Sequence, residues 1–216
     1  MRSFRLLIAA LACLPALAYA GAQQYEPLAA SVQAALHGAV SDARAPEPIF
    51  PSPEEKVRWL GEMSQKLAKR MPDPQERLDF LKTVYYEAQR AGLDPQLVLG
   101  LIQVESGFKK YSVSGAGARG YMQVMPFWVD LIGSKGQNLF HIRTNLRFGC
   151  TILRHYLDIE KGDYYRALGR YNGSLGRPEY PNLVRGAWER QWSFVPTRVA
   201  GQTQSVGQTQ NVAARN

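Results

Sequence analysis

One glutamate has the position expected of a residue that does acid–base chemistry. Glu105 lies near the end of a stretch, residues 93–106, in which apolar side chains recur at helical spacing. Asp94 and Pro95 suit the start of this helix, and Gly107 suits its end. At about 100° per residue, Glu105 falls near the middle of the apolar arc. We therefore expect burial to raise its pKa, which is the shift that a general acid needs near neutral pH.

The position of Glu105 on this helix leaves a second interpretation open. A single glutamate near a helix end can also extend into solvent or pair with a nearby lysine or arginine, and structural ion pairs perturb pKa values too. The residues that follow Glu105 are therefore needed to decide between the two.

A glycine-rich segment, residues 115–120, follows Glu105 and reads GAGARG. It matches the G-x-G-x-x-G pattern of dinucleotide-binding sites, but that pattern is informative only between a strand and a helix. Here a helix precedes it, and no pattern of parallel strands is present in the sequence. We therefore expect a tight loop that lets a polymeric ligand approach the backbone, rather than a nucleotide site.

The sequence lacks the residues that metal-dependent catalysis and serine hydrolases need. His37, His141 and His155 are scattered, without acidic or histidine partners at metal-ligand spacing, and no G-x-S-x-G motif is present. We predict neither a metal nor a cofactor. One buried acid, a glycine loop, amides and aromatic side chains together are typical of a protein that cleaves a sugar polymer, because amides bind N-acetyl and hydroxyl groups and aromatics pack on sugar faces.

Three sequence blocks resemble the signature of the soluble lytic transglycosylase (SLT) domain family. They are ESGF at 105–108, GA at 115–116 with GYMQVMP at 120–126, and YNG at 171–173. The resemblance covers about residues 93–188. It implies an all-α, lysozyme-like fold and an enzyme that cleaves the β-1,4 bond between N-acetylmuramic acid and N-acetylglucosamine in peptidoglycan. The family does so without water and leaves a 1,6-anhydromuramoyl end.

The same resemblance implies a role for each residue of the three blocks. Glu105 is expected to be the single acid and base. The expected substrate-binding residues are Ser106, Met122, Gln123, Tyr171 and Asn172. Ser106 is expected to position the reacting sugar, and the hydroxyl of Tyr171 is expected to hydrogen-bond near the Glu105 carboxyl.

A second carboxylate is missing near the three blocks. Retaining and inverting glycosidases generally use two carboxylates, but Asp94 serves as a helix cap and Asp130 lies on the following helix. With a single acid, the substrate itself supplies the nucleophile or its N-acetyl group assists. Two other functions stay open at this point: a lysozyme-type hydrolase of the same bond, and a non-catalytic scaffold that binds peptidoglycan.

The elements that position these residues are predicted to be helices in a domain at about residues 54–195. Helical periodicity and stop signals predict, besides the helix of Glu105, helices near 53–67, 74–91, 127–131, 145–160, 164–169 and 181–192. No strand pattern of any strength is present. Met122, Val124 and Met125 have an alternative role as core residues, and Tyr171 has one as an ordinary half-buried tyrosine. The pair Asn172–Gly173 has an alternative role as a turn.

Both ends of the chain are predicted to be separate from this domain. Residues 1–20 have a basic start, an apolar run and a small-x-small ending, which is typical of a removed signal peptide. We expect residues 21–53, which are rich in proline and alanine, to form a disordered tether, although a weak helix fits its first half. The polar segment 196–216 is expected to be a disordered tail.

The net charge and the predicted signal peptide limit the classes of partner and the cellular location of the protein. The formal net charge is +8, which favours polyanions such as acidic cell-wall polymers. Nucleic acid is not expected, because no basic run is interleaved with aromatics. We predict a periplasmic protein with no stable membrane span after signal removal. Its expected partners are peptidoglycan glycan strands and, as for other domains of this kind, proteins of the cell-wall or secretion machinery. Cys150 is predicted to be a buried, inert thiol.

Overall fold

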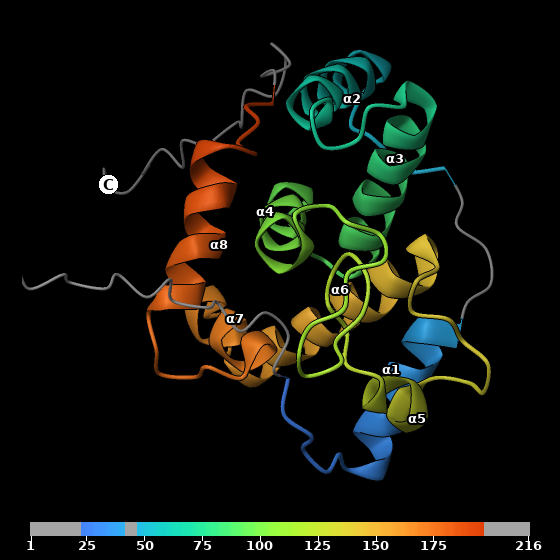
Figure 1. The fold of residues 1–216 in the computed structure, drawn as a ribbon, viewed down its shortest axis with the longest axis vertical. Helices are drawn as coiled ribbons and strands as arrows, with labels where there is room; N and C mark the ends of the chain where they lie inside the picture. The colour runs from blue at the N-terminus through green and yellow to red at the C-terminus, as the bar shows by residue number, and fades with distance from the viewer. Residues whose placement is uncertain (1–22, 42–46, 197–216) are drawn as a thin grey trace, which may run out of the picture.

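The chain folds into a bundle of helices around a central one (Figure 1). The computed structural model describes residues 23–41 and 47–196. Within these ranges the helices are α1 (Ala30–Ser41), α2 (Pro53–Leu67), α3 (Pro74–Arg90), α4 (Pro95–Ser106), α5 (Phe127–Ile132), α6 (Ile142–Ile159), α7 (Tyr164–Asn172) and α8 (Glu179–Arg190). The described residues form no strand, so the all-α prediction is confirmed.

Capping side chains fix where several helices begin. Ser52 and Asp73 accept hydrogen bonds from the backbone N–H groups at the starts of α2 and α3, over 3.1 and 2.7 Å. Asp163 does the same for α7 over 3.0 Å. These short polar side chains replace the intrahelical partners that the first N–H groups of a helix lack. Helix α7 runs to Asn172, three residues beyond the end predicted from the sequence.

Helix α4 forms the centre of the core. Five of its apolar side chains are fully buried: Leu97, Val98, Leu99, Leu101 and Ile102. Helix α8 lies beside it (Figure 1), and the backbones approach closely at Gly100. A Cβ atom there would lie 2.9 Å from the backbone nitrogen of Trp188. Only glycine fits this approach without a shift of one helix.

The described part of the predicted tether contacts the domain. In α1, Leu36 and Val40 are buried, and the Gln33 amide donates to the carbonyl oxygen of Leu131 at the end of α5 over 2.6 Å. After the gap, Phe50 stacks on Tyr85 of α3 with ring centroids 3.8 Å apart. Residues 23–41 therefore add a helix to the domain instead of hanging free, since apolar burial there offsets the entropy cost of ordering it.

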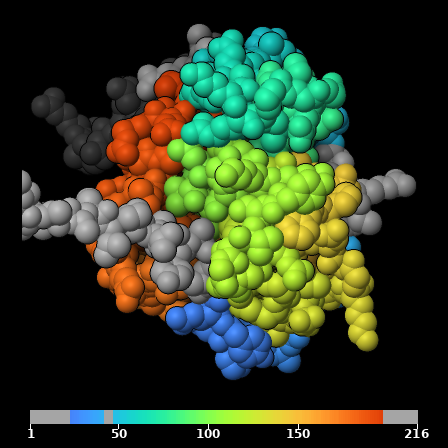
Figure 2. Space-filling view, viewed as in Figure 1, coloured from blue at the N-terminus to red at the C-terminus, as the bar shows by residue number. Residues whose placement is uncertain are grey.

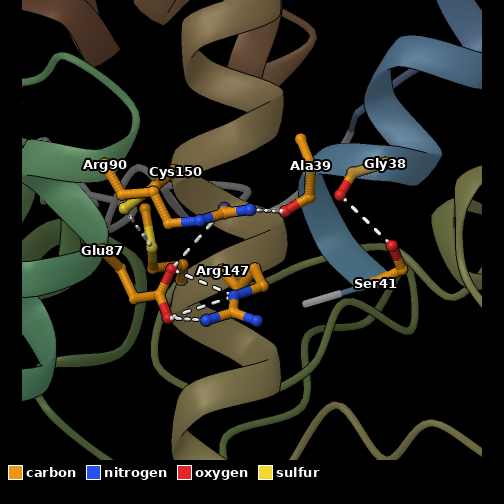
Figure 3. Close-up of polar contacts among 8 residues, drawn as sticks. Gly38, Ala39, Ser41, Glu87, Arg90, Arg147 and Cys150 are labelled. Carbon is orange, nitrogen blue, oxygen red and sulfur yellow. Dashed lines mark hydrogen bonds and ion pairs between the residues drawn. The ribbon is translucent and has the colours of Figure 1, made fainter. Parts of the chain in front are cut away.

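A buried ion pair lies between α3 and α6, beside α1 (Figure 3). Glu87 of α3 and Arg147 of α6 form a two-pronged contact, with Arg147 Nη2 2.8 Å from Glu87 Oε1. Arg90 extends from the same face of α3 and donates to the carbonyl oxygen of Ala39 in α1. The pair thus joins α3 to α6, and Arg90 joins α3 to α1.

The predicted signal peptide and nearly all of the predicted tail lie outside the described residues. Among the helices that are described, none has the length and apolar content needed to cross a membrane.

Candidate active site

Helix α4 carries Glu105 in its last turn. The carboxylate of Asp94 caps the start of α4, accepting from the backbone nitrogen of Gln96 over 2.7 Å. Gly107 ends the helix in the left-handed conformation, with φ of 58°, and its N–H donates to Gln103 over 3.1 Å. Both boundaries agree with the sequence prediction. The Glu105 side chain is only 4% exposed, as its place in the apolar arc predicts.

The two oxygens of the Glu105 carboxyl have different surroundings. The Tyr180 hydroxyl donates to Oε1 over 2.5 Å, whereas Oε2 is buried and has no hydrogen-bond partner among the described residues. Burial raises the pKa of Glu105 to about 8, and the hydrogen bond from Tyr180 lowers it. Glu105 is therefore mostly protonated at neutral pH. Because Oε1 accepts from Tyr180, the proton resides on Oε2.

No second carboxylate acts on Glu105 from the described part of the chain. Burial and the Tyr180 hydroxyl are the only causes of its pKa shift there. The ranges 23–41 and 47–196 also contain no group of three or more histidine, cysteine, aspartate or glutamate side chains suited to hold a metal. A carboxyl that is mostly protonated near neutral pH can give a proton to a bound group, so acid–base chemistry is available at this position.

The glycine-rich segment forms a tight loop opposite α4. Isolated antiparallel bridges join Val113 to Arg119 and Arg119 to Val124. Gly120 adopts φ of 76°, and a Cβ atom there would lie 2.6 Å from the carbonyl oxygen of Leu139. The loop therefore needs glycine at this position for both conformation and space. No strand precedes the loop in the described chain.

Three predicted substrate-binding residues make contacts inside the protein. The Ser106 hydroxyl lies 2.7 Å from the carbonyl oxygen of Tyr121, which ties α4 to the loop. Met122 is fully buried. The Gln123 amide donates to the carbonyl oxygens of Ser112 and Gly120, over 3.1 and 2.9 Å. These side chains hold the shape of the loop, and direct contact with a substrate stays a prediction for each.

Tyr171 and Asn172 lie in the last turn of α7, and both are buried. The hydroxyl of Tyr171 donates to the carbonyl oxygen of Met122 over 2.7 Å. Burial and, next, the charge of Glu105 raise the pKa of Tyr171 well above its ordinary value. The family resemblance predicts a hydrogen bond of the Tyr171 hydroxyl near the Glu105 carboxyl. In the structure this hydroxyl donates to Met122, and the hydroxyl that donates to the carboxyl is that of Tyr180.

Comparison with known proteins then gives the family. Residues 82–182 match the family model described as the transglycosylase SLT domain, a range that includes Glu105 and all three sequence blocks. Just under half of the chain is thus similar to the transglycosylase SLT domain.

Curated relatives match this chain over part of their length. The chain is 33% identical over 103 residues to a transglycosylase of Enterobacteria phage PRD1, covering 48% of this chain and 38% of the relative. It is 32% identical to a membrane-bound lytic murein transglycosylase C of Mannheimia succiniciproducens, covering 45% and 32%. The chain thus spans well under half of these relatives. The lytic transglycosylase Slt of Pseudomonas aeruginosa matches with 20% identity and a TM-score of 0.41, over 62% of this chain and 25% of that one.

Tyr180 is the residue of the SLT domain site that reasoning from the sequence missed. It lies 75 positions after Glu105 and opens helix α8, which packs along α4. The first turn of α8 therefore meets the last turn of α4. The sequence offers only a weak signal for this contact, namely a tyrosine at the start of a helix that supplies core residues. A pairing of particular residues over such a separation depends on how the helices pack.

The raised pKa of Glu105 predicts how stability depends on pH. Between the ordinary value of 4.5 and about 8, the folded SLT domain binds a proton at Glu105 that the unfolded chain releases. Its stability therefore falls as pH rises through this window. The variant Glu105→Gln is neutral at every pH, so we expect it to be about as stable as the wild type near pH 4.5. Near pH 8 its free energy of unfolding should exceed that of the wild type by about 3 to 5 kcal/mol.

Urea unfolding of both proteins across this pH range measures the difference. The exposed Glu179, on the first turn of α8, provides a matched control as Glu179→Gln. A stability gain of Glu105→Gln that stays constant with pH would contradict the assigned pKa.

Proposed function

We propose that this chain is a peptidoglycan lytic transglycosylase. Its substrate is the β-1,4 bond between N-acetylmuramic acid and N-acetylglucosamine, which it cleaves without water to leave 1,6-anhydromuramoyl ends. The observation that carries the proposal is the Glu105 carboxyl within the SLT domain, buried, protonated near neutral pH and unaccompanied by another carboxylate.

In the proposed reaction one side chain acts twice. Glu105 gives the proton on Oε2 to the glycosidic oxygen while the bond from that oxygen to C1 breaks. The substrate N-acetyl group stabilises the positive charge at C1. The 6-hydroxyl oxygen of the same muramoyl residue then attacks C1, and its proton passes to the Glu105 carboxylate. Atoms balance without water, and the acid is regenerated.

The surroundings of Glu105 support both halves of this cycle. Burial favours the neutral acid that begins the reaction, and the Tyr180 hydrogen bond favours the carboxylate that forms after proton transfer. A pKa of about 8 balances these demands near neutral pH. A second carboxylate is not needed, because the nucleophile belongs to the substrate.

Digestion of purified sacculi tests the proposal. We expect muropeptides with anhydro ends, which are lighter by one water than those with reducing ends. Release of reducing ends alone would instead indicate a lysozyme-type hydrolase. Sacculus binding without any release, unchanged in Glu105→Gln, would indicate a non-catalytic scaffold.

We infer that the protein works in the periplasm, on the basis of the signal-like residues 1–20. Glycan strands are its proposed partners, with proteins of cell-wall or secretion machinery as further candidates. Trapping and sequencing the N-terminus of the exported protein tests the location: a chain that begins at Gly21 supports it, and an intact cytoplasmic chain contradicts it.

Loss of the Tyr180 hydroxyl is expected to slow the reaction and shift its pH dependence. In Tyr180→Phe the Glu105 carboxylate loses its hydrogen bond, so the pKa of Glu105 rises further and the alkaline limb of the activity profile moves to higher pH. Hydrogen bonds to charged groups contribute about 1.5 to 3 kcal/mol, so we expect about 10- to 100-fold slower muropeptide release.

The pH profile of muropeptide release measures this effect. Tyr165→Phe is a matched control, because that hydroxyl only contacts the Pro178 carbonyl oxygen near the surface, over 3.3 Å. A shift of the alkaline limb to lower pH in Tyr180→Phe would contradict the assigned hydrogen bond.

A further inference from the structure

We propose that residues 23–28 are an intramolecular inhibitor of the active site, which we call the strap. In this proposal the side-chain amide of Gln23 occupies the place of a substrate N-acetyl group, and the strap must leave before a glycan strand binds. The proposal rests on the proposed function for the identity of the ligand.

Gln23 makes a paired contact with the loop opposite Glu105. Its Nε2 donates to the carbonyl oxygen of Gln123, and its Oε1 accepts from the backbone nitrogen of Met125, both over 3.2 Å. The Gln23 side chain also hydrogen-bonds to Tyr171, a residue whose pKa responds to the charge of Glu105. Gln23 is 4% exposed, although it lies near the start of the described chain. A polar side chain buried in this way occupies a built polar site.

The rest of the strap extends from this loop to helix α7. The Tyr25 ring meets Phe127 edge-on, with centroids 5.7 Å apart. The Glu26 carboxylate lies 3.4 Å from Nη1 of Arg170. The strap therefore joins the two segments that carry the second and third sequence blocks. In Figure 2 the N-terminal residues, in blue, lie at the lower edge of the green surface that contains the loop.

The chemistry of the Gln23 contact matches that of the proposed substrate. A carboxamide offers one carbonyl acceptor and N–H donors on the same planar group. The acetamido group of an N-acetylated sugar offers the same pair, a carbonyl and an N–H. The carbonyl of Gln123 and the N–H of Met125 therefore suit either group, and only one can occupy them at a time. Unsubstituted sugars lack this pair.

The burial of Glu105 shows that the described state of the site is closed. Oε2, which carries the proton to be transferred, is covered in this structure, and a glycosidic oxygen has to reach it. The described state is thus closed to a polymer. The strap is held by a few hydrogen bonds, one ring contact, the partly buried Leu28 and one partly exposed ion pair, so a glycan strand that binds the loop can displace it. When only a fraction of molecules is open, the apparent dissociation constant rises by the inverse of that fraction.

Sugar binding in a catalytically inactive background tests the strap directly. The full chain with Glu105→Gln is titrated with N-acetylglucosamine tetramer, alone and with Gln23→Ala, Glu26→Gln or Gln24→Ala. We expect Gln23→Ala to bind the tetramer about five- to thirtyfold more tightly, because the side-chain hydrogen bonds of Gln23 that hold the closed state are lost. Glu26→Gln loosens the other end of the strap and is expected to tighten binding less. Gln24, which is exposed, is the matched control and should change nothing.

Two further comparisons make the result decisive. Cellotetraose has the same linkage but no acetamido groups, so in the Gln23→Ala background it should bind far more weakly than the N-acetylglucosamine tetramer; equal affinity would overturn the acetamido assignment. Unchanged or weaker binding of the N-acetylglucosamine tetramer in Gln23→Ala would overturn the strap as an inhibitor. Failure of the proposed function would be seen separately, as sacculi that neither the wild type nor Gln23→Ala digests, since the binding measurement needs no turnover.

Discussion

Glutamine at position 105 is expected to slow muropeptide release from sacculi by about 10²- to 10⁴-fold, the usual contribution of a positioned acid or base. Glutamine has nearly the shape of glutamate, and its carbonyl oxygen can accept the Tyr180 hydrogen bond that Oε1 accepts now. It cannot give a proton to the glycosidic oxygen or take one from the 6-hydroxyl. The variant should therefore keep its fold and lose the chemistry.

The initial rate of muropeptide release, measured at equal sacculus binding, checks this expectation. Glu179→Gln is a control that changes an exposed glutamate one residue before Tyr180. It is expected to digest sacculi at the wild-type rate. If Glu105→Gln kept more than about a tenth of the wild-type rate, another group would have to be the acid.

Removal of one partner of the buried ion pair is expected to have the largest effect on stability. Arg147 and Glu87 are 3% and 1% exposed, and Nε and Nη2 of Arg147 both donate to the carboxylate (Figure 3). Glu87→Ala leaves the guanidinium buried without its main partner. We therefore expect a loss of about 3 to 5 kcal/mol in the free energy of unfolding, as measured by urea denaturation.

A double variant separates the pair itself from the cost of leaving one charge alone. Replacing both residues with apolar side chains of similar volume, Glu87→Leu with Arg147→Met, removes both buried charges together. Such replacements are often neutral or stabilising. We expect the double variant to be at least as stable as either single one, so that the effects are strongly non-additive. Single-variant losses below about 1 kcal/mol, or losses that simply add, would contradict the structural description of the pair.

The central helix illustrates what the sequence makes predictable. An aspartate cap, a proline, an apolar arc and a terminal glycine define α4 locally, and the structure begins and ends it at the predicted residues. Helix α1 lacks such signals. Its attachment depends on contacts such as that between Arg90 and the carbonyl oxygen of Ala39, which pair a side chain with a backbone group. Any residue offers a backbone carbonyl, so sequence reasoning could not anticipate this contact.

The candidate active site also combines features that the sequence predicts with features that it does not. The burial of Glu105 follows from its position on one helix, and its raised pKa follows from the burial. Tyr180 and Gln23 reach the site from segments far away in the chain. Their contacts depend on how α8 and the N-terminal segment pack, which no local pattern encodes. The family resemblance indicated Tyr171 as a site residue, but it did not indicate which tyrosine hydroxyl donates to the Glu105 carboxyl.

Titration of the Glu105 carboxyl tests the central claim most directly. The chemical shift of its side-chain carboxyl carbon can be followed by NMR in ¹³C-labelled protein, with the signal assigned by its absence from Glu105→Gln. We predict a midpoint near a pKa of about 8, so that the carboxyl is still mostly protonated at neutral pH. A midpoint near the ordinary glutamate value of 4.5 would contradict the claim, because Glu105 would then have no proton to donate when a glycan strand arrives.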